Sequence, residues 1–123
     1  MKQIRLKVRM IDGHKLRKHY PDLIGGSHRY ADKIVPKGEL WIEKMKNPKE
    51  HRFFLAHEGI EYLLMHLRRL SYPYAHGVAT KLELALRKGS CPEATIKRYC
   101  VKYLGKKRGE LCAGPLAAAY RRI

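Results

Sequence analysis

The chain has 123 residues, enough for one domain with a single hydrophobic core. Its hydrophobic fraction of 45% is ordinary for a globular protein, so the net charge of +16 belongs to the surface and does not indicate disorder. The three cysteines lack C-x-x-C spacing, which argues against a disulfide framework and a zinc ribbon, and no apolar run suits a signal peptide or a membrane span. These features predict a cytoplasmic protein without a membrane partner.

Residues 3–43 are predicted to form a small antiparallel sheet of about three strands. The first strand is indicated by a strict alternation of apolar and basic residues from Ile4 to Met10. Residues 14–27 contain Pro21-Asp22 and Gly25-Gly26, which predicts a loop with at most a short helical turn.

A hairpin is predicted around the turn sequence Pro36-Lys37-Gly38, because residues 28–35 and 39–43 are rich in β-forming side chains. Trp41, in the second of these segments, is interpreted as a packing residue. The histidines of this part of the chain have no ligand spacing among themselves and are interpreted as structural or solvated: His14, His19 and His28.

Three helices are predicted after the strands. The first begins at Asn47-Pro48-Lys49-Glu50, which has the form of a capping box, and ends before Ser71. The second runs from about residue 73 to Arg87, and the third begins at Ser90-Cys91-Pro92-Glu93 and ends at Gly105.

The C-terminal residues complete a single α+β domain. Residues 106–115 are basic and contain glycine, and residues 116–123 are expected to form a short terminal helix or to fray. The expected organisation is strands over about 3–43, two helices over about 48–88, and a third helix with a basic tail over 90–123.

The first helix contains the run His57-Glu58-Gly59-Ile60-Glu61. Residues four apart lie on the same face of a helix, so His57 and Glu61 can direct a ring nitrogen and a carboxylate oxygen at one ion, with Glu58 beside it. An ionised glutamate next to a buried stripe is costly unless it is paired or bound to a metal, which favours a metal site. The stripe consists of Phe53, Ala56, Ile60, Leu63, Leu64, Leu67 and Leu70.

The run resembles the H-E-x-x-H helix of zinc metallopeptidases, with Glu61 in place of the second histidine. The short connection at 71–74 predicts an antiparallel second helix, on which Glu83 lies near the level of Glu61 and His76 lies closer to the turn. This order resembles the gluzincin branch of the zincins, in which a glutamate on the following helix supplies the third ligand. The resemblance implies a zincin-like fold that binds zinc, with iron(II) or manganese(II) as alternatives, through His57, Glu61 and either Glu83 or His76.

The function implied by this resemblance is a metal-dependent hydrolase, peptidase-like, acting on a peptide or protein substrate. Glu58 would act as general base on a metal-bound water, and Tyr72 or Tyr74 would donate to a developing oxyanion. The segment at 39–43, if it is an edge strand, could hold an extended peptide by strand addition.

The charge leaves a second function class open, a non-enzymatic nucleic-acid-binding protein with a structural or vestigial metal site. Basic residues concentrate at both ends of the chain, and Tyr99, Tyr103 and Tyr120 stand among Lys and Arg. A metal-dependent nuclease is a third alternative, although such sites favour clustered carboxylates with magnesium.

Overall fold

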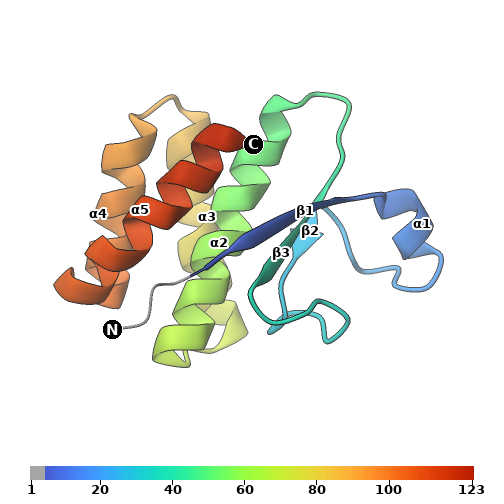
Figure 1. The fold of residues 1–123 in the computed structure, drawn as a ribbon, viewed down its shortest axis with the longest axis horizontal. Helices are drawn as coiled ribbons and strands as arrows, with labels where there is room; N and C mark the ends of the chain where they lie inside the picture. The colour runs from blue at the N-terminus through green and yellow to red at the C-terminus, as the bar shows by residue number, and fades with distance from the viewer. Residues whose placement is uncertain (1–4) are drawn as a thin grey trace.

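The computed structural model describes residues 5–123, which form a three-stranded sheet and five helices (Figure 1). The α+β class is therefore confirmed. The start of the predicted first strand, Ile4, lies outside the described residues.

The sheet is mixed, which corrects the expected antiparallel arrangement. Its order is β1-β3-β2, with β1 (Lys7–Ile11) parallel to β3 (Glu39–Glu43) and β2 (Gly26–Ser27) antiparallel to β3. A short helix, α1 (Gly13–Arg17), begins the connection between β1 and β2, as the loop prediction allowed.

The predicted hairpin around Pro36-Lys37-Gly38 is wrong. Residues 28–38 form turns instead of a strand, since the His28 carbonyl accepts hydrogen bonds from the Ala31 and Asp32 amides. The antiparallel partner of β3 is β2, whose residues Gly26 and Ser27 pair with Ile42 and Trp41. The 39–43 segment is consequently the central strand and offers no free edge for a peptide.

Two long antiparallel helices follow the sheet. α2 (Lys49–Arg68) begins after Asn47, whose Oδ1 accepts the Lys49 amide at 3.1 Å, and α3 (Tyr72–Arg87) begins after Ser71, whose Oγ accepts the Tyr74 amide at 3.4 Å. α2 starts within the predicted segment 47–50, although Glu50 pairs with Arg87 and does not close a capping box, and α3 starts one residue before the predicted position near residue 73.

The C-terminal part is more helical than predicted. α4 (Pro92–Leu104) matches the expectation, but the expected basic tail is one helix, α5 (Lys106–Arg122), which includes Pro115. The cost of Gly and Pro inside a helix is offset by burial of one α5 face against α4 and α2, formed by Cys112, Ala113, Leu116, Ala117 and Tyr120.

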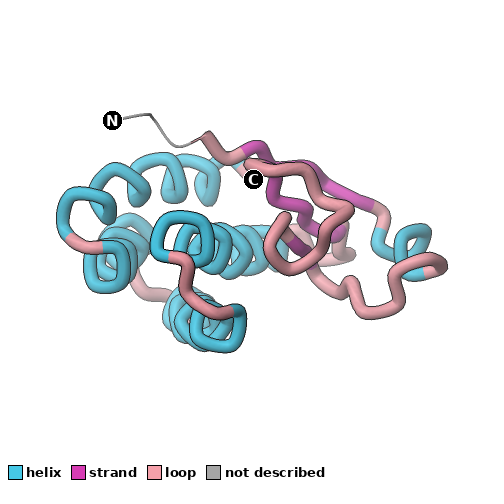
Figure 2. The backbone as a smooth tube through the Cα atoms, turned by 90° about the horizontal axis from the view of Figure 1, so that it is seen from below, coloured by secondary structure: helices cyan, strands magenta, loops and turns pink. Residues whose placement is uncertain are grey.

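α2 to α5 form a bundle on one side of the sheet, and α1 lies apart from it beyond the end of β1 (Figures 1 and 2). The core joins Leu40 and Ile42 of β3 to fully buried side chains of α2, including Leu55, Ile60 and Leu63. Within residues 5–123, no helix combines the length and the apolar character that a membrane crossing requires.

Candidate metal centre

α2 places both predicted ligands at the edge of the core. His57 and Glu61 are 8% and 1% exposed, and His57 Nε2 lies 3.3 Å from Glu61 Oε2. The helical spacing of four residues accounts for this proximity. A carboxylate so deeply buried requires partners with positive charge or hydrogen-bond donors.

α3 brings His76 to the same point. His76 Nδ1 lies 3.0 Å from Glu61 Oε2 and 3.3 Å from His57 Nε2. The three atoms thus form a triangle with edges of 3.0–3.3 Å. Ligands at zinc distances of about 2.0–2.1 Å in a tetrahedron are separated by about 3.3 Å, so the triangle has the size of one face of such a site.

Glu83 lies on the other side of the His57 ring. Its Oε1 lies 3.0 Å from His57 Nδ1, which is close enough for an ion pair. The two groups are not aligned for a hydrogen bond. Its Oε2 accepts from Arg87 Nε at 2.8 Å. The sequence left Glu83 and His76 as alternatives, and the structure brings both to His57, at opposite ring nitrogens.

His28 is a site residue that the sequence interpretation missed. It is fully buried, and its Nε2 lies 2.6 Å from Glu61 Oε1. Because its Nδ1 accepts the Tyr30 amide at 3.2 Å, the ring proton resides on Nε2, which donates to Glu61. No local signal could reveal this contact, since His28 and Glu61 are 33 positions apart.

A second group of donor atoms, from His28, Glu58 and Glu61, is also close enough to surround an ion. The tautomer of His28 argues against it, because Nε2 carries a proton and has no free lone pair. Within residues 5–123, no backbone amide fixes the ring proton of His57 or His76 in this way.

Glu58 lies beside the triangle. Its side chain is 12% exposed, and its Oε2 is 3.9 Å from His57 Nε2. Burial, reinforced by the charge of Glu61 and opposed by that of His57, raises the pKa of Glu58 to about 8. The β2 backbone packs tightly here, since a Cβ on Gly26 would lie 2.5 Å from the Trp41 carbonyl oxygen and 3.2 Å from Glu58 Cγ.

The two α2 residues of the triangle are strongly coupled. Burial alone would lower the pKa of His57, but Glu61, Glu83 and Glu58 raise it to about 10. Burial would raise the pKa of Glu61, but His28 and His57 lower it to about 2. In the free protein His57 therefore holds a proton against Glu61, and a metal would have to displace that proton.

The triangle opens into a cavity of about 240 Å³. Among residues 5–123, no Lys or Arg lines it, whereas five of the eleven acidic residues of the chain do: Asp22, Asp32, Glu58, Glu61 and Glu83. Tyr72 lies at the rim, 44% exposed, with its hydroxyl 3.5 Å from His76 Nδ1, and Tyr74 does not line the cavity. The cavity is an anionic pocket in a basic protein and favours a cation.

Comparison with known proteins found no match for this chain. No protein-family model matches the chain, and neither a curated protein nor a solved structure matches it.

Proposed function

We propose that this protein is a metal-dependent hydrolase of the peptidase type, in which His57, Glu61 and His76 hold zinc. The observation that carries the proposal is the triangle of donor atoms, with edges of 3.0–3.3 Å, at the base of an anionic cavity. Two imidazoles and one carboxylate also suit iron(II) and manganese(II).

The surrounding residues fit the roles of an outer shell. Glu83 faces His57 Nδ1 and leaves Nε2 directed at the other two donors, while His28 holds the Glu61 oxygen that faces away from them. Zinc, when bound, would polarise a carbonyl group and lower the pKa of a water molecule to about 7.

Glu58 and Tyr72 supply the remaining groups that hydrolysis needs. Glu58 lies beside the triangle and, in its ionised form, would accept a proton from water and return it to the leaving amine. Tyr72 stands at the rim with a hydroxyl that can donate to a developing oxyanion. Five carboxylates without a Lys or Arg among the lining residues repel phosphate, which favours an amide over a phosphodiester substrate.

Metal analysis of purified protein tests the site. After resupply of zinc and iron, wild type should contain about one equivalent, and His57→Ala, Glu61→Ala and His76→Ala less than about a tenth. Exposed His19 provides the control, since His19→Ala should bind metal like wild type. Glu83→Gln should keep the stoichiometry at reduced affinity, because it removes an outer partner. A wild-type protein without metal would refute the proposal.

The catalytic role of Glu58 is tested separately. Glu58→Gln should keep the metal and reduce turnover of a peptide library by at least about 100-fold, because the amide cannot accept the proton. Glu110→Gln, an exposed carboxylate on α5, is the matched control. Equal activity of Glu58→Gln and wild type would remove Glu58 from the mechanism.

A further inference from the structure

One end of the helical bundle is strongly basic within residues 5–123. α2 and α4 end there and α5 begins there, and the stretches 62–82 and 94–109 contain no Asp or Glu. We call this surface the basic end. Its six residues are all exposed: Arg68, Arg69, Lys102, Lys106, Lys107 and Arg108.

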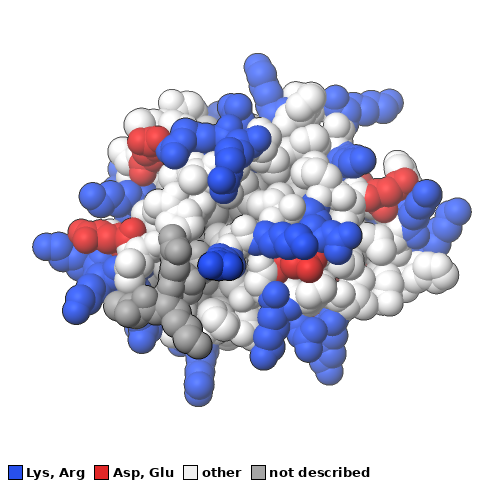
Figure 3. Space-filling view, viewed as in Figure 1, with Lys and Arg blue, Asp and Glu red and all other residues white. Residues whose placement is uncertain are grey.

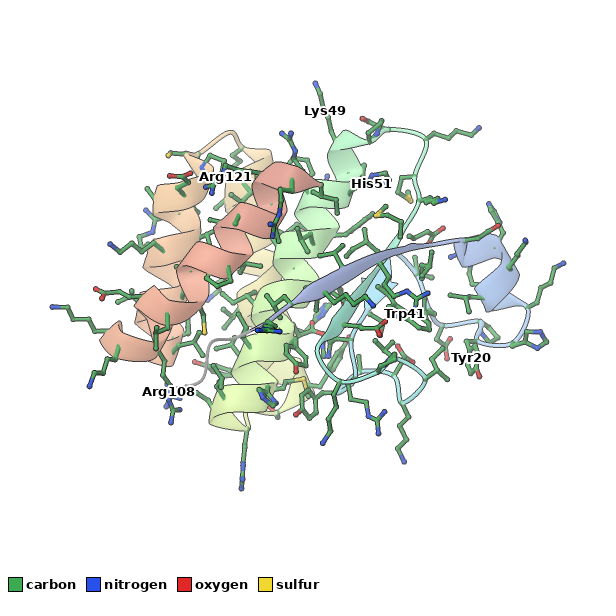
Figure 4. The ribbon with its side chains drawn as sticks, in the orientation of Figure 1. Tyr20, Trp41, Lys49, His51, Arg108 and Arg121 are labelled. Atoms are coloured by element: carbon green, nitrogen blue, oxygen red, sulfur yellow. The ribbon has the colours of Figure 1, made fainter. Side chains whose placement is uncertain are left out.

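Hydrogen bonds hold the parts of the basic end together. Arg68 Nη1 donates to the Tyr103 carbonyl at 2.9 Å, and Arg108 Nη1 donates to the Leu67 carbonyl at 3.1 Å. Arg108 accordingly lies at the end of α5 that adjoins the end of α2 (Figure 4). The cations therefore belong to one surface fixed by the fold.

No member of the basic end forms an ion pair with an acid of residues 5–123. Like charges held together repel one another, and this repulsion opposes folding. Lys106, Lys107 and Arg108 also occupy the first turn of α5, where the helix dipole disfavours cations and no side chain caps the free amides. A bound anion would relieve both costs.

The backbone at Arg69 is a further sign of function. Arg69 follows the last residue of α2 and has φ 52° and ψ 34°, a left-handed conformation usually taken by glycine. A non-glycine residue there costs free energy, and such residues concentrate at functional sites. Glycine would adopt this backbone conformation at a lower cost in free energy, yet the residue here is a cationic arginine.

Exposed aromatic rings follow the basic end along the chain. Tyr72 and Tyr74, in the first turn of α3, are 44% and 53% exposed, and Tyr74 makes no side-chain hydrogen bond within residues 5–123. Flat rings beside cations are the combination that binds single strands, because bases stack on the rings while phosphates contact the cations. Insertion into a lipid surface needs a wide apolar face. On α5, within residues 5–123, Leu111 is the one exposed large aliphatic side chain, so such a face is lacking there.

We infer that the basic end binds the phosphate backbone of single-stranded nucleic acid and that Tyr74 stacks on one of its bases. The nucleic acid is a partner and not the substrate, because the anionic cavity excludes phosphate. The inference does not depend on the metal site, so metal-free and zinc-supplied protein should bind alike.

The experiment measures the anisotropy of a labelled oligothymidylate over a range of salt concentrations. One variant combines Arg69→Gln, Lys102→Gln, Lys106→Gln and Lys107→Gln, and removal of four phosphate contacts should reduce the slope of log affinity against log salt by about three. The control removes the same charge from exposed positions of the sheet side and should leave the slope unchanged: Lys15→Gln, Lys18→Gln, Lys44→Gln and Lys46→Gln.

Tyr74→Ala should weaken binding by at least about fivefold at every salt concentration, because stacking does not depend on counterions. Tyr20→Ala, which removes another exposed tyrosine, should not. The inference is overturned if both charge variants weaken binding equally, if a duplex binds as tightly as the single strand, or if Tyr74→Ala has no effect. It is also overturned if anionic vesicles bind the protein and the oligonucleotide does not compete.

Discussion

A single hydrogen bond from His28 determines which oxygen of Glu61 would be free to bind the proposed metal. His28 Nε2 occupies Oε1 at 2.6 Å, so Oε2 is the oxygen that faces His57 and His76. The Tyr30 amide in turn fixes the His28 tautomer. A turn that precedes β3 thus orients a side chain on α2.

We predict that His28→Ala weakens zinc binding by about 10- to 100-fold, as loss of an outer partner typically does. His28→Gln should recover part of the affinity, since its amide can donate to Glu61. Competition with a chromophoric chelator measures both. Wild-type affinity in a folded His28→Ala protein would show that His28 does not orient the ligand.

Glu43 is a second buried carboxylate whose charge depends on one partner. Arg17 Nη1 and Nη2 donate to its two oxygens at 2.7 and 2.8 Å, and the Gly25 amide donates at 3.1 Å. The hydrogen bond from Arg17 lowers the pKa of Glu43 below its ordinary value of 4.5, against the effect of burial. This cluster joins α1 and the β2 strand to the end of β3.

The unfolded chain consequently binds a proton on Glu43 at higher pH than the folded protein does. The stabilisation is fully present above about pH 4.5 and is lost as the pH falls through the lower folded pKa. Glu43→Gln should reduce the free energy of unfolding by about 2 kcal/mol at pH 7 and by less at pH 3. Urea unfolding at the two pH values measures this difference, and an equal loss at both would contradict it.

At the scale of elements, the pairing of α2 with α3 builds the site. Arg87 near the end of α3 contacts Glu50 at 2.7 Å and Glu83 at 2.8 Å, and its guanidinium lies 4.5 Å from the centre of the Phe53 ring. These contacts set the level at which α3 passes α2. His76 and Glu83 then reach the same histidine from positions two turns apart.

The pairing of α4 with α5 depends on close backbone contact at Gly109. A Cβ at this position would lie 2.4 Å from Val101 Cα, whereas a Cβ at Gly114, on the same helix, would meet no atom of residues 5–123 within 4 Å. We predict that Gly109→Ala destabilises the protein by about 1–3 kcal/mol through overpacking.

Gly114→Ala should instead stabilise it by about 0.5–1 kcal/mol, because alanine favours helix more than glycine does. Urea unfolding of the two variants provides the comparison. The same sign of effect for both would contradict the predicted close approach of α4 and α5.

At the scale of the whole molecule, the two signs of charge are unevenly distributed. Lys and Arg are spread over the face shown in Figure 3, with a few patches of Asp and Glu among them, while five of the eleven acidic residues line one cavity. The molecule thus has a net positive charge of +16 and one cavity lined by carboxylates. This distribution is what the two proposals use, a polyanion on the basic surface and a cation in the cavity.

Binding of a metal to the folded state alone should stabilise the whole molecule. At a free zinc concentration 100-fold above Kd, the expected gain is about 2.7 kcal/mol. Calorimetry should show a rise in Tm that EDTA reverses and that Glu61→Ala lacks. An unchanged Tm with zinc would contradict selective binding to the folded protein.

The sequence by itself determined the α+β class, the starts of α2, α3 and α4, and the proximity of His57 and Glu61. These features depend on contacts between residues a few positions apart, which periodicity and capping residues record directly. It also restricted the third donor to His76 or Glu83, because the short turn at Ser71 requires antiparallel helices.

Only the tertiary structure decided the parallel pairing of β1 with β3, the continuous α5, and the contact of His28 with Glu61. Each of these features depends on contacts between residues far apart in the chain, which the spacing of apolar residues along the sequence does not predict. Local propensity also predicted the wrong structure in places, since the segment 28–35 is rich in β-forming residues but forms turns. The hydrolytic reaction stays a prediction drawn from the residues of the site.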